Sequence, residues 1–292
     1  MILNHSQATV DYSLRMILCK KAILCEGDSD ELVIQKAYMQ LNDGRLPIED
    51  GIEVISVGVS FLRFLEIADC IQTKIAVVTD NDGDLAGYDL DIIKSMLQAD
   101  CDVTMVGDPR QVTYHTHNEA KYKKYADGKI EEFIRSECKK IDCIIDKETL
   151  NDSYRNNQSI CSYSSLLYEE YGETGTKQFE VTGHDGVFLV RPDDIDAYLE
   201  KFKPMQLREK RTVKVNDAYA VINMGEAKGL TYDRVLIYPT GTMRNWMMDH
   251  SKKLQPKTRS QFYVAITRAS YSVGIVFDYD EKTNIEGVEN YL

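Results

Sequence analysis

The stretch IAVVTDNDGDLAG, residues 75–87, determines which fold the sequence predicts. Its first four residues are apolar and predict a buried strand. Three carboxylates, Asp80, Asp82 and Asp84, follow directly, and Gly83 keeps the local backbone permissive. Ligands of parallel α/β sheets bind beyond the carboxyl ends of the strands. An acidic cluster at this position therefore predicts a site for a divalent cation.

The sequence on both sides of this stretch alternates between strand and helix patterns. One expected helix, residues 30–41, has its apolar side chains at Leu32, Val33, Ala37, Tyr38 and Leu41. The expected strands are residues 22–25, 52–57, 74–79 and 103–106, and the expected helices are residues 1–18, 30–41, 61–70 and 89–98. This order predicts an α/β fold with a parallel, Rossmann-like sheet and helical crossovers.

A second α/β pattern follows a charged, tyrosine-rich segment. That segment includes KYKKY, residues 121–125, and a domain boundary is expected between residues 111 and 142. Beyond it, the expected strands are residues 143–145, 186–191, 218–222, 234–238 and 272–277, and the expected helices are residues 159–171, 192–202 and 260–269.

Composition narrows the class of protein. The 292 residues are enough for two domains, and 43% hydrophobic with 28% charged residues is typical of a globular chain. The formal net charge is −12, whereas proteins that coat nucleic acid are usually basic. No apolar run approaches the roughly 18 residues of a membrane helix, and the seven cysteines contain no CxxC pair. We therefore expect a cytoplasmic protein with reduced thiols and no membrane partner.

The carboxylates of two expected strands form the first candidate site. Glu26 ends the strand at residues 22–25, and Asp30 lies one helical turn later. Together with Asp80 and Asp82, they predict a site for Mg²⁺ or Mn²⁺. The alternative interpretation of Asp-Asn-Asp-Gly is an ordinary turn.

Three segments near these carboxylates resemble the TOPRIM domain of OLD-family nucleases. They are CEGDSDE at residues 25–31, VISVGVSFLRFLEI at residues 54–67 and VVTDNDGD at residues 77–84. The resemblance implies metal-dependent DNA cleavage, with Glu26, Asp30, Asp80 and Asp82 as metal ligands. It also implies catalytic roles for Glu26, Asp80 and Asp82, with Glu26 as a general acid–base.

Four later segments resemble motifs III to VI of UvrD-like superfamily 1 helicases, in family order. They are VTMVGDPRQVTY at residues 103–114, LNDSYRNNQSI at residues 150–160, INMGEAKGLTYDRVLIYPT at residues 222–240 and QFYVAITRAS at residues 261–270. The resemblance implies a RecA-like lobe that binds ATP. It assigns γ-phosphate sensing to Gln111, positive charge around the phosphate to Arg155 and Arg268, and close approach of the backbone to the phosphate to Gly229.

Motifs that belong to the front of such a helicase are incomplete. The string DNDGDLAGYDLDII can be laid on the family's acidic motif II, with Asp80 in the metal-binding position and Asp84 in the last one. No GxxxxGK[ST] loop is present, and GETGTKQ at residues 172–178 lacks a Ser or Thr after Lys177. We therefore predict no autonomous ATP hydrolysis.

The two resemblances predict a TOPRIM-like segment at residues 1–84, a motif III segment and linker at residues 85–140, and a RecA-like helicase lobe at residues 141–292. Three functions remain open: a Mg²⁺- or Mn²⁺-dependent DNA endonuclease, a helicase-derived ATPase, and a non-catalytic assembly subunit. OLD-type nucleases and UvrD-like helicases are partners in Gabija-type anti-phage defence. The resemblance thus implies DNA as a partner, together with a second protein or further copies of this chain.

Overall fold

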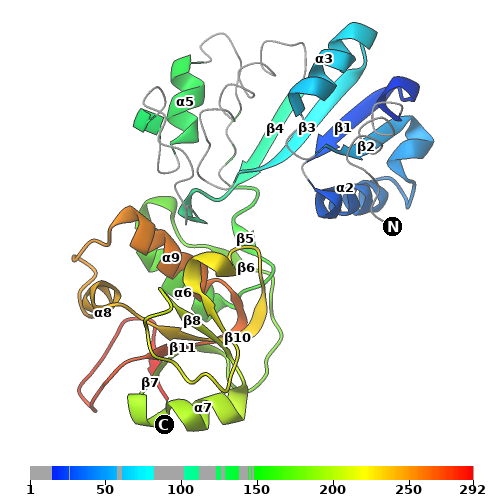
Figure 1. The fold of residues 1–292 in the computed structure, drawn as a ribbon. Coiled ribbons are helices and arrows are strands. Elements are labelled where there is room, and N and C mark those ends of the chain that lie inside the picture. The colour runs from blue at the N-terminus through cyan, green and yellow to red at the C-terminus, as the bar shows by residue number, and fades with distance from the viewer. Residues whose placement is uncertain are drawn as a thin grey trace. The chain divides into compact units, whose positions relative to one another are not determined.

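The computed structural model describes residues 15–25, 27–57, 61–81, 102–111, 123–125, 129–137, 144, 146 and 148–291. The chain divides into two compact units (Figure 1). The first comprises Met1–Asp108 and Thr116–Cys143, and the second comprises Pro109–His115 and Ile144–Leu292. The predicted limits at residues 84 and 140 stay a prediction.

A four-stranded parallel sheet forms the centre of the first unit, in the order β2-β1-β3-β4. Its strands are β1 (Lys21–Cys25), β2 (Ile52–Ser56), β3 (Lys74–Asn81) and β4 (Asp102–Gly107). β3 pairs in parallel on both sides, with Val77 opposite Leu24 of β1 and Val78 opposite Thr104 of β4. The strand before the acidic stretch is therefore integrated into one sheet, and the predicted parallel α/β fold is confirmed.

Alternating residues of this sheet build its core. Ala22 and Leu24 of β1 lie with Ile75 and Val77 of β3 on one face, where they pack against Phe64 of α3. In the described part of this unit, residues 15–18 are helical, and the further helices and 3-10 turns are α2 (Asp28–Leu41), η1 (Pro47–Asp50), α3 (Phe61–Ile71), η3 (Lys123–Tyr125) and α5 (Ile130–Glu137).

The helix predicted for residues 30–41 is present as α2, and three of its apolar side chains are exposed to solvent. Leu32, Val33 and Leu41 are 68%, 67% and 84% exposed. The guanidinium of Arg15 instead ties α2 to β2 through Glu31, at 3.2 Å, and Glu53, at 2.5 Å. These half-buried ion pairs hold α2 against β2. The spacing of apolar residues in the sequence of α2 could not reveal the ion pairs.

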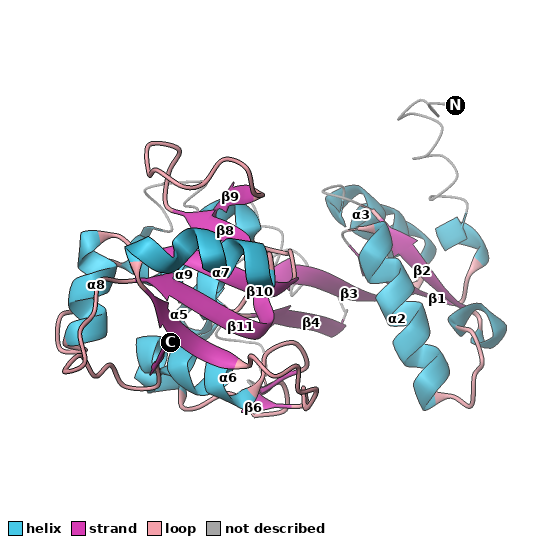
Figure 2. Cartoon of the chain, turned by 90° about the horizontal axis from the view of Figure 1, so that it is seen from below, coloured by secondary structure: helices cyan, strands magenta, loops and turns pink. Residues whose placement is uncertain are grey.

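A six-stranded parallel sheet forms the centre of the second unit, in the order β12-β7-β11-β10-β8-β9 (Figure 2). Its strands are β7 (Gly186–Val190), β8 (Met205–Arg208), β9 (Val221–Asn223), β10 (Tyr232–Tyr238), β11 (Ala269–Val276) and β12 (Glu289–Asn290). A separate parallel pair consists of β5 (Asp152–Ser153) and β6 (Gly175–Thr176).

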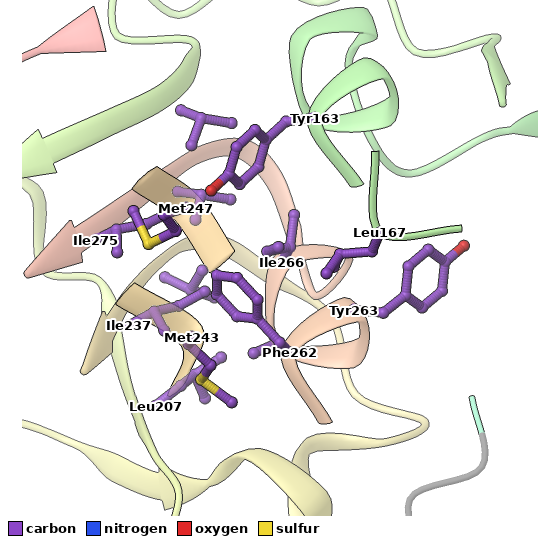
Figure 3. Packing of buried hydrophobic residues seen from close by; sticks show 14 of the residues in the cluster. Tyr163, Leu167, Leu207, Ile237, Met243, Met247, Phe262, Tyr263, Ile266 and Ile275 are labelled. Atoms are coloured by element: carbon purple, nitrogen blue, oxygen red, sulfur yellow. The ribbon is translucent and has the colours of Figure 1, made fainter. Parts of the chain in front are cut away.

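Helices cover both faces of the larger sheet, with α9 and α7 on opposite sides (Figure 1). The main core joins α6, α8 and α9 to one face; Phe262 and Ile266 of α9 pack there with Ile237 and Ile275 (Figure 3). Tyr198 of α7 belongs to the core of the other face. The helices and 3-10 turns are η2 (Pro109–Gln111), α6 (Gln158–Ser165), η4 (Leu166–Tyr171), η5 (Pro192–Asp194), α7 (Ile195–Phe202), η6 (Met224–Ala227), α8 (Gly241–Met248) and α9 (Pro256–Ile266).

Some predicted elements differ from the observed ones. The helix predicted for residues 159–171 divides into α6 and η4, and Tyr168 has non-helical φ and ψ of −138° and 57°. The helix predicted for residues 260–269 ends at Ile266, because Ala269 already begins β11. Residues 89–98 lie outside the described residues, and so does most of the strand predicted for residues 143–145, of which Ile144 is in neither a helix nor a strand. Among the described helices, none combines the length and the apolar character that crossing a membrane requires.

Candidate functional site

The carboxyl ends of β1 and β3 lie side by side, as the predicted metal site requires. Cys25, the last residue of β1, is in register with Val78 of β3, and Asp80 follows two residues later within β3. The backbone of Asp80 pairs with Val106 of β4, but its side chain lies outside the described parts. Glu26 and Asp82 also lie outside the described residues. Of the four predicted ligands, Asp30 is the one whose side chain can be examined.

Asp30 lies in the first turn of α2, directly after β1. Its Oδ2 accepts a hydrogen bond from the backbone N–H of Gly27 at 2.9 Å. This bond fixes the carboxylate at the N-terminus of the helix, where the helix dipole favours negative charge. Among the described residues, the second oxygen of Asp30, Oδ1, accepts no hydrogen bond. Asp30 thus keeps one oxygen for a cation.

The electrostatics at this strand end favour a cation. Burial, together with the negative charges of Glu31, Asp30 and Asp28, raises the pKa of the Cys25 thiol to about 12. Oxygen ligands in a negative field are what Mg²⁺ and Mn²⁺ prefer. The described residues alone hold no group of three or more metal-ligating side chains. Among the described residues, Asp30 therefore supplies one oxygen ligand of the kind that such a cation prefers.

The predicted nucleotide-binding residues form a second cluster, within the second unit. Arg268 is only 2% exposed, and its guanidinium donates to the carbonyl oxygens of Val264, at 3.2 Å, and Leu230, at 3.3 Å. Its Nη2 also lies 3.4 Å from Oε1 of Gln111. The structure therefore brings Gln111 and Arg268 together across a long separation in sequence.

Arg155 joins the same cluster through the residue before Arg268. Its Nη1 donates to the carbonyl oxygen of Thr267 at 3.2 Å. Burial lowers the pKa of the Arg155 guanidinium from its usual value. Arg155 is less buried than Arg268, so it is the better placed of the two to meet a bound anion.

Gly229 lies one residue before Leu230, whose carbonyl oxygen accepts from Arg268. Its φ of +79° belongs to the left-handed region, which side chains rarely adopt. A Cβ built at Gly229 would meet no atom within 4 Å, so the conformation, rather than crowding, calls for glycine here. All four predicted nucleotide-binding residues are thus collected in one region of the second unit.

Sequence reasoning missed two polar residues that organise this cluster. The buried amide of Asn156 donates to the carbonyl oxygens of Thr267, at 3.0 Å, and Ala269, at 2.7 Å. Arg110 donates to Oγ1 of Thr174 at 2.9 Å and lies 4.8 Å from the ring centroid of Tyr263. Asn156 directly follows Arg155, and Arg110 directly precedes Gln111. This adjacency in the sequence was the signal that could have identified both residues.

Lys177 lies in a different environment from a phosphate-binding lysine. Its Nζ pairs with Asp152 at 2.8 Å, and the preceding residues Gly175 and Thr176 form β6. A phosphate-binding loop of the Walker type would instead lead into a helix. GETGTKQ is therefore part of a small strand pair.

Comparisons with known proteins give one family match, within the first unit, and a likeness in fold to solved structures. Residues 17–82 match the family model "Overcoming lysogenization defect protein-like, TOPRIM domain". TOPRIM domains generally bind divalent metal ions and carry metal-dependent nuclease or primase activity, so the match indicates that chemistry for this segment. No curated protein sequence matches the chain.

Among solved structures, the chain is similar in fold to the arterivirus nonstructural protein 10 (helicase) in complex with DNA. The TM-score is 0.50 at 14% identity, over 91% of this chain and 57% of the helicase, so the chain spans little more than half of that protein. The C-terminal domain of a possible DNA helicase from Lactobacillus plantarum WCFS1 has a TM-score of 0.30 at 11% identity, over 47% of this chain and 98% of that one. PRRSV nsp10 (helicase) has a TM-score of 0.28 at 13% identity, over 94% of this chain and 52% of that one. The arterivirus likeness shows a shared α/β fold, and the family match identifies residues 17–82 as TOPRIM-like.

Proposed function

We propose that this protein processes DNA, with a metal-dependent cleavage site of the TOPRIM type joined to a helicase-derived lobe. The observation that carries the proposal is the family match over residues 17–82, which covers the parallel strands β1 and β3. The carboxylates Glu26 and Asp80 belong to the carboxyl ends of these strands in the sequence. This is the edge at which parallel sheets bind their ligands.

Glu26, Asp30, Asp80 and Asp82 would hold Mg²⁺ or Mn²⁺. The bound ion would polarise a phosphoryl oxygen and lower the pKa of a water molecule. Glu26 would exchange a proton with the attacking or leaving oxygen, because it belongs to the same strand end. Asp30 is already oriented by the N–H of Gly27, which lowers the entropy lost when its other oxygen binds a cation.

Cleavage of supercoiled plasmid and linear duplex DNA in Mg²⁺ or Mn²⁺ tests this proposal. We expect Asp80→Ala and Glu26→Ala to reduce cleavage to the level measured with a chelator. Asp69→Ala removes an exposed carboxylate of α3 in the same unit and serves as the matched control. Cleavage that survives both site variants at the wild-type rate would exclude this site as the source of the activity.

A second candidate function, nucleotide binding by the helicase-derived lobe, is favoured by the convergence of Gln111, Arg155 and Arg268. Two arginines and an amide can surround a γ-phosphate. Binding of a fluorescent ATP analogue tests this function. Arg155→Gln should weaken binding, whereas Arg244→Gln, which removes an exposed arginine of α8, should leave it unchanged. Equal affinities of both variants and the wild type would argue against the cluster.

We further propose that the protein acts in an assembly of the anti-phage-defence type, with a helicase-like protein or further copies of itself. The support is the combination of TOPRIM-like and helicase-like sequences in one chain. Light scattering of the purified protein measures its own oligomeric state. A non-catalytic assembly role gains support if neither DNA cleavage nor ATP turnover is detected while the protein forms a defined oligomer.

A further inference from the structure

Two hollows adjoin each other on the second unit, outside the nucleotide-binding cluster. The first has a volume of about 450 Å³ and the second of about 540 Å³. Phe202 and Arg234 line both, so the hollows meet at these two side chains. The remaining lining includes Thr182, His184, Lys201 and Tyr291 in the first, and Lys203, Tyr219, Tyr232 and Asp233 in the second. We call the two hollows together the Phe202 groove.

Three cations, Lys201, Lys203 and Arg234, line this groove in an otherwise acidic protein. Residues 201–214, KFKPMQLREKRTVK, contain six lysines and arginines and a single glutamate, whereas the whole chain has a net charge of −12. Lys201 and Lys203 are exposed and flank Phe202 at the end of α7. Among the described residues, neither lysine makes an ion pair with a carboxylate. Their charges are therefore available to an anion.

Arg234 is held in place at the meeting point of the two hollows. Its Nη1 donates to the carbonyl oxygen of His184 and, at 2.7 Å, to Oγ of Ser272. Its Nη2 donates to Oγ1 of Thr182 at 2.5 Å. These hydrogen-bond partners are neutral and fix the position of the charge, and the carboxylate of Asp185 lies close enough to interact with it electrostatically. A preorganised cation of this kind loses little entropy when an anion binds.

Aromatic rings line the groove between the cations. Nζ of Lys201 lies 5.0 Å from the ring centroid of Phe202 and 5.8 Å from that of Tyr291. His184 is stacked between Phe202, at 3.9 Å, and Phe188, at 4.1 Å, which makes the wall rigid. Phe202 and Tyr291 are only partly buried, so part of each ring can receive a further flat group.

Cations that alternate with partly exposed aromatic rings are the chemistry that binds single-stranded nucleic acid. The cations contact phosphates, and the bases stack on the rings without a requirement for sequence. A duplex hides the faces of its bases and cannot use the rings. Asp233 adds a carboxylate that repels phosphate in the second hollow and can accept a hydrogen bond from the amino group of a base.

We propose that the Phe202 groove binds single-stranded nucleic acid, with phosphates at Lys201, Lys203 and Arg234 and bases against Phe202 and Tyr291. The groove would hold one strand on the helicase-derived unit, separately from the metal site at β1 and β3. This inference deepens the proposed function by assigning the nucleic-acid partner a surface, and it does not require that the metal site be active.

Fluorescence anisotropy with the full chain and a labelled oligothymidylate of about 20 nucleotides tests the proposal. The measurements are made in a chelator over a range of salt concentrations. For Lys201→Gln/Lys203→Gln, we expect the slope of log affinity against log salt to become shallower by about 1.4, because single strands lose about 0.7 per phosphate contact. The matched control, Lys252→Gln/Lys253→Gln, removes two exposed lysines elsewhere in the same unit and should keep the wild-type slope.

A second variant tests the stacking. Phe202→Leu should weaken binding about tenfold, as expected when one base loses an aromatic partner. Tyr154→Leu removes a ring that is 81% exposed and should leave the affinity unchanged. Circular dichroism identifies any loss of folding in Phe202→Leu, and the exposed lysine pair keeps the proposal testable in that case.

Three unlabelled competitors distinguish a single strand from a mononucleotide and from a duplex. Unlabelled oligothymidylate should displace the probe far more effectively than thymidine monophosphate or a duplex of the same length. The proposal is overturned if the lysine pair can be removed without a change in affinity or slope, or if the mononucleotide or the duplex competes equally well. Because chelator prevents metal-dependent cleavage, an inactive metal site would leave this result unaffected.

Discussion

Asn156 holds together the two segments that carry the predicted nucleotide-binding arginines. Its side chain is 5% exposed and donates to the carbonyl oxygens of Thr267 and Ala269 on either side of Arg268. We predict that Asn156→Ala lowers the free energy of unfolding of the second unit by about 2–3 kcal/mol, because two buried carbonyl groups lose their donor. Urea denaturation followed by circular dichroism measures this loss.

Asn151→Ala is the matched control for that measurement. Its side chain also donates to a carbonyl oxygen, that of Glu173 at 3.0 Å, but the bond is exposed to solvent. Water can replace it, so the stability should change by no more than about 0.5 kcal/mol. Equal losses in the two variants would contradict the role of burial at Asn156.

His184 predicts a pH dependence of stability. Burial, followed by the charges of Arg234 and Lys201, lowers the pKa of its imidazole from 6.5 to about 4, against the opposite effect of Asp185. Between these two pKa values the unfolded chain binds the proton and the folded chain does not, so stability falls as the pH drops from 6.5 towards 4. Because the ring is only half-buried, we expect His184 to contribute a loss of about 1–2 kcal/mol.

Urea denaturation at several pH values tests this expectation. His184→Gln should remove the corresponding part of the slope between pH 6.5 and about pH 4. His250→Gln changes a histidine outside the Phe202 groove and provides the comparison. A slope that His184→Gln leaves intact would assign the pH dependence to other groups.

At the scale of elements, strands with a continuous apolar run were easier to predict from the sequence than short strands or strands that contain buried polar residues. The sequence predicted β1, β3, β7 and β10 because their apolar runs are continuous. It missed β8, whose middle residue Gln206 is fully buried and satisfied by Asn216 and Tyr238. It also missed α8, although Thr240 caps the helix and the buried residues Met243, Trp246 and Met247 have the i, i+3, i+4 spacing of a helix. Buried polar partners and caps depend on contacts that a one-dimensional pattern does not contain.

Gly274 marks the place where α7 packs closely on β11. A Cβ at this position would lie 3.0 Å from Cδ1 of Leu236 and 3.0 Å from the ring of Tyr198. We predict that Gly274→Ala destabilises the second unit by about 1–3 kcal/mol, because neither buried neighbour can move freely. Thermal unfolding followed by circular dichroism provides the measurement.

Gly241→Ala tests whether the effect comes from packing. Gly241 begins α8, and a Cβ there would meet no atom within 4 Å. Alanine favours a helix over glycine by up to about 1 kcal/mol, so this variant should be as stable as the wild type or more stable. If both alanine variants were destabilised alike, the loss of stability would come from replacing a glycine in the backbone and not from packing at Gly274.

At the scale of the whole molecule, the parallel α/β architecture could be predicted, whereas the details of the sites could not. Gln111, Arg155, Gly229 and Arg268 were selected because they lie in ordered motifs, and the structure brings them together. The sequence did not reveal that Arg268 is almost fully buried. It also gave no sign of the Phe202 groove, because Arg234 and Tyr291 lie far from residue 202 in the chain. Sites assembled from such distant residues depend on the pairing of strands.

The two units have separate hydrophobic cores. Leu24 belongs to a core drawn from residues 16–77, and Ile237 belongs to one drawn from residues 160–285. Both side chains are fully buried, so truncating either to alanine should cost about 2–5 kcal/mol. Because the cores share no residue, we predict that Leu24→Ala reduces hydrogen-exchange protection in β1–β3, and that Ile237→Ala reduces it in β7, β10 and β11. Leu150→Ala, at a residue that is 74% exposed, should change neither region. Loss of protection in both units from either truncation would instead mean that the two cores unfold as one cooperative structure.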